Sequence, residues 1–276
     1  MRKKRSSQSG QIVLIVLLVL TIATTIALSL ISRSTTDVTI SSQLEDSSRA
    51  FGAAEAGIEE ALKSGTGTGG AKVLTAGVTY SASVSSIGGA AGVFQFSKKS
   101  FRGVTETLWL VAHNADGSLA ETPTYTNPSF SVCWTSETTK PAITASILYK
   151  RAGMYYVAKD AFDPDAARAA ANTFNGVTAS SGGCGVPSMY RRLITFADYG
   201  INPVTDTLLM LRIRPVYSDT QLAIDAPVAL PLQGNKIESS GTTGAGITRK
   251  ILVYRQYHVA SGIFDRSLYS QSSLSH

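Results

Sequence analysis

Few residues of this 276-residue chain have the type and spacing that catalysis or metal binding requires. The histidines His113, His258 and His276 lie far apart, and none has a partner at metal-ligand or catalytic-triad spacing. No serine sits in a Gly-x-Ser-x-Gly motif, the usual mark of a serine hydrolase. We therefore expect structural or solvent-facing histidines and a protein that is not an enzyme. An exported enzyme is the minor alternative.

One acidic cluster has the chemistry to bind a cation. Asp160, Asp163 and Asp165 would supply the carboxylate oxygens that calcium prefers. Their spacing does not match the EF-hand loop, and Asp163 is also the expected N-cap of a short helix. The sequence therefore predicts no cofactor, with calcium at this cluster as the alternative.

Basic and aromatic residues are interleaved near the middle of the chain. They are Tyr149, Lys150, Arg151, Tyr155, Tyr156 and Lys159. Such mixtures bind single-stranded nucleic acids, but they also fit a β-hairpin with half-buried tyrosines and solvated cations, which is the favoured interpretation. The overall charge also argues against nucleic-acid binding. Four of the cations lie in residues 2–5, before the apolar segment, and the rest of the chain has 21 cations and 19 anions. Nucleic acid is not an expected partner.

Cys133 and Cys184 are the two cysteines of the chain. In a domain outside the cytoplasm, an even number of cysteines indicates a disulfide. Closing a loop of about fifty residues would stabilise the fold by about 4 kcal/mol in the chain-entropy model. Two unpaired buried thiols are the alternative.

The elements that position these residues begin with an apolar segment. Residues 12–31 contain nothing more polar than Ser and Thr, and at ~1.5 Å per residue they span the ~30 Å hydrocarbon core as a transmembrane helix. The preceding cations favour a cytoplasmic N-terminus, with everything after Ile31 outside. The run is longer than that of a secretory signal, so a retained helix is favoured over conventional signal cleavage.

The helix is expected to continue to Lys63, because residues 32–63 lack Pro and their second half is rich in Ala, Glu and Leu. A kink is most easily accommodated in the Ser/Thr-rich residues 32–42. Large apolar residues share one helix face and are expected to hold it to the β-rich domain, although some can face neighbouring chains: Leu44, Phe51, Ile58 and Leu62. Small residues would let another backbone approach closely: Ala50, Ala53, Ala54, Ala56 and Gly57.

Residues 64–70, rich in Gly, Ser and Thr, are expected to form a linker. They resemble phosphate-binding loops faintly, but they precede no helix and lack the Gly-Lys-Ser/Thr ending. Residues 71–276 show the alternation and turn residues of strands, with a hairpin turning at residues 151–153. The predicted fold is α+β: a long N-terminal helix followed by an antiparallel, sandwich-like β domain.

The N-terminal residues resemble a known family. A basic leader over residues 1–10 that ends in Gly10, followed by a long helix over residues 11–63, resembles the type IV pilin superfamily. The stretch from Ala50 to Leu62 resembles that of PilX-type minor pilins. The resemblance implies a pilin-like fold, cleavage after Gly10 by a prepilin peptidase, and N-methylation of Gln11. Gln11 departs from the Phe or Met with which most pilins begin.

Ile15 is a second departure from the family pattern. Counted from Gln11 it is the fifth mature residue, where major pilins carry a glutamate that pairs with a neighbour's terminal amine. A carboxylate in an apolar core costs several kcal/mol unless it is paired, so major pilins keep it for that contact. PilX-type and pseudopilus-tip proteins also lack the glutamate. The resemblance therefore implies a tip or assembly-initiating subunit.

Together these features predict a minor pilin, a structural subunit of a type IV pilus or related filament. It would first be a single-pass protein of the cytoplasmic (inner) membrane and then part of an extracellular pilus or the cell surface. The expected partners are other pilin subunits, the pilus assembly machinery, the prepilin peptidase and, before assembly, membrane lipid. The alternative is an uncleaved, membrane-anchored adhesin or binding module. A DNA-capturing subunit would need a basic patch on the mature domain.

Overall fold

The computed structural model describes residues 9–114, 116–177, 184, 190–259 and 262. The chain divides into two compact units. We call residues up to 84 together with 237–253 the helical unit, and residues 85–236 together with those from 254 onward the sandwich unit. The β-rich region expected as one domain from residue 71 therefore contributes to both units, because its first and last strands pack with the N-terminal helix.

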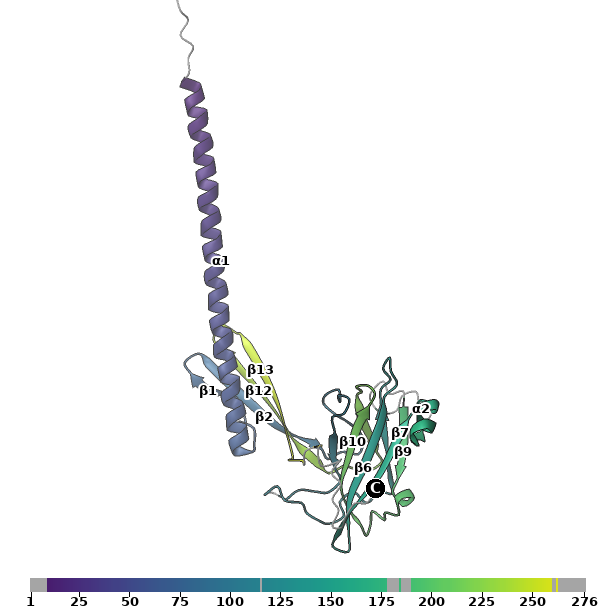
Figure 1. Ribbon diagram of the computed structural model, residues 1–276. Coiled ribbons are helices and arrows are strands. Elements are labelled where there is room, and N and C mark those ends of the chain that lie inside the picture. Colours follow the sequence, from purple (N-terminus) through teal and green to yellow (C-terminus); the bar gives the residue numbers. More distant parts are fainter. Residues whose placement is uncertain (1–8, 115, 178–183, 185–189, 260–261, 263–276) are drawn as a thin grey trace, which may run out of the picture. The chain divides into compact units, whose positions relative to one another are not determined.

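The N-terminal helix α1 (Ser9–Ser64) is continuous over 56 residues (Figure 1). The Ser/Thr-rich stretch does not break it. Thr35 and Thr36 donate hydrogen bonds from their hydroxyls to the carbonyl of Ser32, both at 2.9 Å, so these polar groups are satisfied within the helix. The helix ends where Gly65 adopts a positive φ of 72° and donates its N–H to the carbonyl of Ala61.

A four-stranded sheet belongs largely to the helical unit. Its order is β1 (Lys72–Thr75), β2 (Val78–Gly88), β12 (Leu232–Thr243), β13 (Thr248–Gln256). The first two strands follow the linker and the last two come from near the end of the chain. A small core lies between this sheet and α1, formed by Ile58, Ala61, Ala82 and Ile237.

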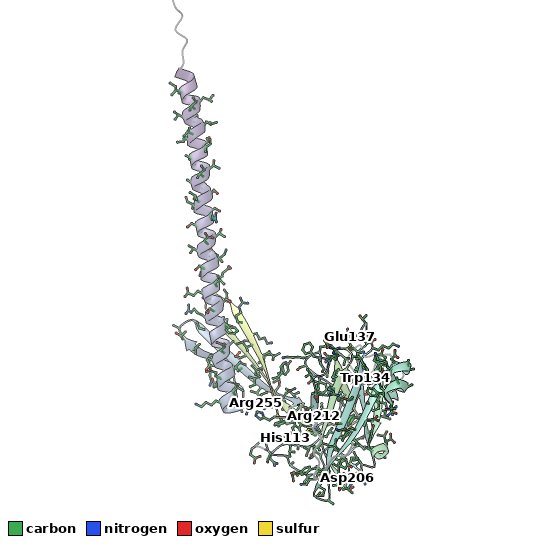
Figure 2. All side chains as sticks on the ribbon, in the orientation of Figure 1. His113, Trp134, Glu137, Asp206, Arg212 and Arg255 are labelled. Carbon is green, nitrogen blue, oxygen red and sulfur yellow. A yellow bond between two sulfur atoms is a disulfide. The ribbon has the colours of Figure 1, made fainter. Side chains whose placement is uncertain are left out.

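Two sheets form the sandwich unit. One has the order β4 (Glu106–Trp109), β10 (Thr207–Val216), β6 (Ala142–Arg151), β7 (Met154–Asp163), β8 (Asn175–Gly176). The other has the order β3 (Gly92–Gln95), β11 (Leu222–Ala226), β5 (Ser129–Trp134), β9 (Tyr190–Thr195). Side chains from both sheets share one core, including Phe130 and Trp134 from the second and Ile143 and Leu211 from the first (Trp134 is labelled in Figure 2). The predicted α+β fold with a β-sandwich is confirmed.

The predicted disulfide is present in the sandwich unit. Cys133 lies on β5 and is bonded to Cys184; their sequence separation is 51, and their Cα atoms are 6.3 Å apart. Both cysteines are fully buried beside Ala223 of β11. The bond therefore fixes Cys184, which is distant in sequence, to an inner strand of the sheet β3–β11–β5–β9.

The short helix α2 (Ala166–Asn172) corrects one expectation from the sequence. Its N-cap is Asp165, whose carboxylate accepts the N–H of Arg168, and not Asp163. Asp163 ends strand β7, two residues too early to reach the unpaired N–H groups of the first turn. Its buried carboxylate instead accepts two hydrogen bonds from the guanidinium of Arg168, at 2.7 and 2.9 Å.

The β6–β7 hairpin turns where the sequence predicts. Ala152 and Gly153 both have positive φ, 48° and 81°, as a tight type I′ turn requires. Arg151 donates two hydrogen bonds to the carboxylate of Asp206, at 2.8 and 2.6 Å, and Lys150 pairs with Glu121. These two cations therefore bind carboxylates of their own unit.

The Arg151–Asp206 pair makes stability depend on pH. Hydrogen bonds from Arg151 lower the pKa of Asp206, whose side chain is 4% exposed. A depressed folded-state pKa stabilises the protein above the unfolded value of about 3.9, and this contribution is lost as pH falls through the folded value. We expect Asp206→Asn to lower stability at pH 7 by about 1–3 kcal/mol. We also expect the difference from the wild type to shrink below about pH 4.

Thermal unfolding of the full-length protein in detergent, measured from pH 2 to pH 7, checks this expectation. Lys98→Gln serves as the control, because Lys98 is exposed and no hydrogen bond or ion pair of its side chain occurs among the described residues. A difference between wild type and Asp206→Asn that stays constant at every pH would show that the ionisation of Asp206 does not contribute to stability.

Candidate functional site

The first half of α1 presents an apolar surface that no other described part of the chain covers. Ile12, Leu14 and Leu18 are 62%, 68% and 56% exposed, and their neighbours up to Ile31 project from the helix in the same way (Figure 2). Of the described helices, α1 alone, from Ile12, is long and apolar enough to cross a membrane. An apolar surface of this length is unfavourable in contact with water and needs a cover of lipid or of other apolar helices.

Three threonine hydroxyls within this apolar half are satisfied by the helix itself. The side chains of Thr21, Thr24 and Thr25 donate to carbonyls three or four residues earlier, at 2.5–3.0 Å. Polar groups that already have partners do not have to keep water when the helix enters an apolar environment. The segment can therefore exchange one dry environment for another with these three threonine hydroxyls still hydrogen-bonded.

The residues expected at the leader junction lie at the start of α1. Gly10 and Gln11 are in its first turn, whereas residues 1–8 and the side chain of Gln11 lie outside the described part. Ile15 is 52% exposed on the helix surface. The first charged residue after Gln11 is Arg33, so no carboxylate is available along the apolar half.

The second half of α1 packs on the sheet of the helical unit through small residues. Ala50, Ala53 and Ala54 are fully buried, and Ile58 is 8% exposed. The expectation that large apolar residues make this contact is corrected for Leu44, Phe51 and Leu62, which are 67%, 47% and 40% exposed. The small side chains let strand β12 approach α1 so closely that larger side chains must lie on the other faces of the helix.

Gly241 of β12 is the closest point of this contact. A Cβ atom at this position would lie 2.0 Å from the carbonyl oxygen of Ala50 and 2.6 Å from the nitrogen of Ala54. Only glycine has room there, because both obstacles are helix backbone. The sequence alone did not single out Gly241, since it precedes a turn and looks like one of many turn glycines. No pattern in one sequence pairs it with an alanine almost 200 residues earlier.

Polar contacts also hold the second half of α1 to the sheet. Glu60 accepts a hydrogen bond from the hydroxyl of Tyr80 at 2.7 Å and forms an ion pair with Lys72. Hydrogen bonds from Lys72 and Tyr80 lower the pKa of Glu60. Arg249 of β13 donates to the hydroxyl of Ser47 at 2.8 Å. The helix is thereby tied to β1, β2 and β13 as well as to β12.

The other candidate residues do not form a catalytic or metal centre in the described part of the chain. His113 and His258, distant in sequence, line one cavity of about 620 Å³ in the sandwich unit. His113 stacks on Tyr257 with 3.7 Å between ring centroids, and burial lowers its pKa. His276 lies outside the described residues. Among those described, no group of three or more His, Cys, Asp or Glu side chains is placed to hold a metal ion.

The three aspartates considered for calcium have separate protein partners. Asp163 binds Arg168, and Asp165 caps α2. Asp160 accepts the hydroxyl of Tyr199 and the amide of Asn175, both at 2.7 Å. Because the carboxylates face different groups, they do not converge on one point.

The contact at Gly241 leads to a testable expectation. Gly241→Ala should destabilise the full-length protein by about 3 kcal/mol or more, because the added methyl overlaps helix backbone. Gly52→Ala is the matched control, since a Cβ at this helical position would meet nothing within 4 Å. The control should stabilise the protein by about 0.5–1 kcal/mol. Thermal unfolding in detergent measures both, and equal effects of the two variants would contradict the close packing.

Comparison with known proteins bears on the helix alone. No solved structure and no curated protein matches the chain. One family model does, and its match starts at the first described residue of α1 and includes most of the buried alanines. The N-terminal segment of this chain, residues 9–59, thus matches the family model described as PilX N-terminal.

Proposed function

We propose that this protein is a minor pilin, a structural subunit of a type IV pilus or related filament that catalyses no reaction. The observation that carries the proposal is the PilX N-terminal match over residues 9–59. It coincides with one continuous helix whose apolar half is uncovered and whose second half packs on a sheet. This combination suits a subunit that joins other helices through one half and supports a β-rich domain with the other.

In this proposal the chain is made as a precursor anchored in the cytoplasmic membrane. A prepilin peptidase cuts after Gly10 and methylates Gln11, and the assembly machinery then extracts the subunit. Residues 12–31 exchange lipid for the helices of neighbouring pilins, an exchange favoured by the self-satisfied hydroxyls of Thr21 and Thr24. The β-rich part lies outside the cell.

The N-terminus of the mature protein tests processing. Mass spectrometry of the native protein should find a chain that starts at Gln11 and carries one added methyl group. Gly10→Leu should leave the leader attached, because the peptidase needs a small residue at the cut site, whereas Gly52→Ala should be processed normally. A native wild-type protein that starts at Met1 would contradict the pilin proposal and support the uncleaved adhesin or binding module.

We further propose a position at the filament tip, or a role in initiating assembly. The support is Ile15, an apolar side chain where a repeating subunit would need a carboxylate for its neighbour's amine. Without it, the chain accepts no such contact from a following subunit. The apolar side chain also avoids the cost of burying an unpaired charge.

Immunogold electron microscopy checks this position. Antibodies against the β-rich part should label the ends of filaments from wild-type cells. Ile15→Glu restores the carboxylate and is expected to increase the number of labelled sites per filament. Wild-type label spread evenly along the filaments would contradict the proposed position.

A further inference from the structure

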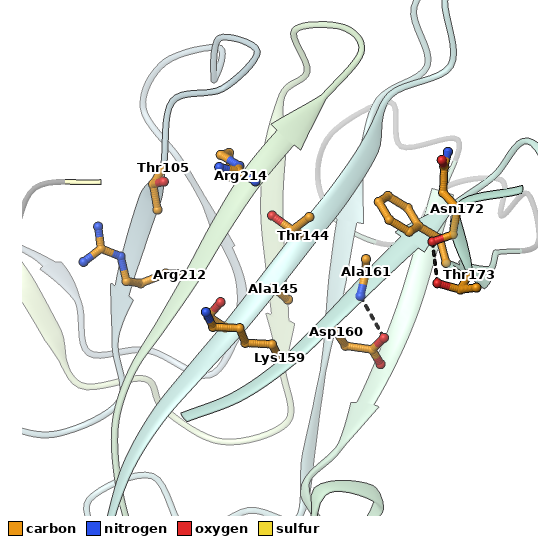
Figure 3. A pocket seen from close by; sticks show the side chains of 12 residues that line it. Thr105, Thr144, Ala145, Lys159, Asp160, Ala161, Asn172, Thr173, Arg212 and Arg214 are labelled. Carbon is orange, nitrogen blue, oxygen red and sulfur yellow. Dashed lines mark hydrogen bonds between the residues drawn. The ribbon is translucent and has the colours of Figure 1, made fainter. Parts of the chain in front are cut away.

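A groove of about 420 Å³ lies on the outer face of the five-stranded sheet in the sandwich unit (Figure 3). Its floor is formed by strands β10, β6 and β7, and one wall by the segment that joins α2 to β8. The volume falls within the range of small-molecule sites, about 300–1,000 Å³. The groove belongs to one unit and is independent of how the N-terminus is processed.

Strand register places the polar residues of the groove in two rows. Arg212 of β10 is opposite Ser146 of β6, which is in turn opposite Lys159 of β7. In the next row Arg214 is opposite Thr144. Because side chains alternate along a strand, these residues share the outer face while their neighbours Leu211 and Ile213 enter the core.

The groove is positively charged. Lys159, Arg212 and Arg214 line it, against the single carboxylate of Asp160. That carboxylate is already occupied, because it accepts hydrogen bonds from the N–H of Ala161, from Asn175 and from Tyr199, each at 2.7 Å. Within the described residues, the half-buried guanidinium of Arg214 has neither a hydrogen bond nor a carboxylate partner.

The remaining lining has a different chemistry. Thr105, Thr144, Ser146 and Asn172 offer hydroxyl and amide groups, which both donate and accept hydrogen bonds. Phe174 adds an aromatic ring. A bare inorganic anion would use these groups as donors only and would leave their acceptor atoms and the aromatic ring without a partner. This lining suits a ligand that has one anionic group, several hydroxyls and an apolar C–H face.

We propose that this groove, which we call the outer-sheet groove, binds an acidic carbohydrate. Arg214 holds the carboxylate of the sugar through its planar, two-pronged donor. Thr144 and Ser146 hydrogen-bond the sugar hydroxyls, and the ring of Phe174 covers a C–H face. A nucleic acid strand fits less well, because stacking successive bases needs several exposed rings along a track and the groove has one.

The probes for this proposal are glucuronic acid, galacturonic acid and N-acetylneuraminic acid, with glucose and galactose as neutral counterparts. Ligand-observed NMR and calorimetry use the full-length protein in detergent, and the detergent alone serves as the blank. We expect at least one acidic sugar to bind at least about ten-fold more tightly than the neutral sugars. A charge-assisted hydrogen bond contributes enough binding free energy for a difference of this size. Arg214→Gln should abolish this preference.

Three further samples separate the outcomes. Thr144→Val keeps the shape of the groove and should weaken binding of the acidic sugar. This variant tests the proposal even if Arg214→Gln fails to fold. Lys98→Gln removes an exposed cation outside the groove and should bind as the wild type does. Inorganic phosphate should compete poorly. No binding of any acidic sugar, equal loss in Lys98→Gln, or phosphate competing as well as the sugar would each overturn the proposal.

Discussion

The close approach of strand β12 to helix α1 is the constraint on which the helical unit depends. At Gly241 the two backbones leave no space for even one methyl group. This proximity requires alanines on the facing side of α1, at Ala50, Ala53 and Ala54. It also brings the last strands of the chain against a helix from its beginning. One glycine and three alanines thereby allow the close contact between α1 and β12.

The same constraint determines what α1 can offer to partners. Because small residues face the sheet, Leu44, Phe51 and Leu62 remain on the exposed surface. They lie beyond Arg33 and Asp37, which separate them from the apolar surface of residues 12–31. In the proposed filament, these side chains are available to neighbouring subunits. The proposal thus assigns packing inside the subunit and packing between subunits to different faces of one helix.

Local sequence signals predicted several features because the physics behind them is local. The β6–β7 turn follows from Gly153, and the continuous helix follows from a long stretch without Pro. Strand β11, an inner strand of its sheet, has no such local signal. Its five residues, Leu222–Ala226, are too short a run for alternation to stand out. The sequence does not distinguish Asp163, which binds Arg168, from Asp165, which caps α2, because cap and ion-pair roles use the same residue type.

The sequence by itself determined the apolar helix, the α+β class, the cysteine pair and the PilX resemblance, because each depends on composition or short-range spacing. Tertiary structure alone decided which helix face meets the sheet, why Gly241 must be glycine, and that Arg212, Arg214 and Lys159 share a groove. Those facts depend on strand register and on contacts between residues far apart in the chain. A single sequence carries no local signal for either.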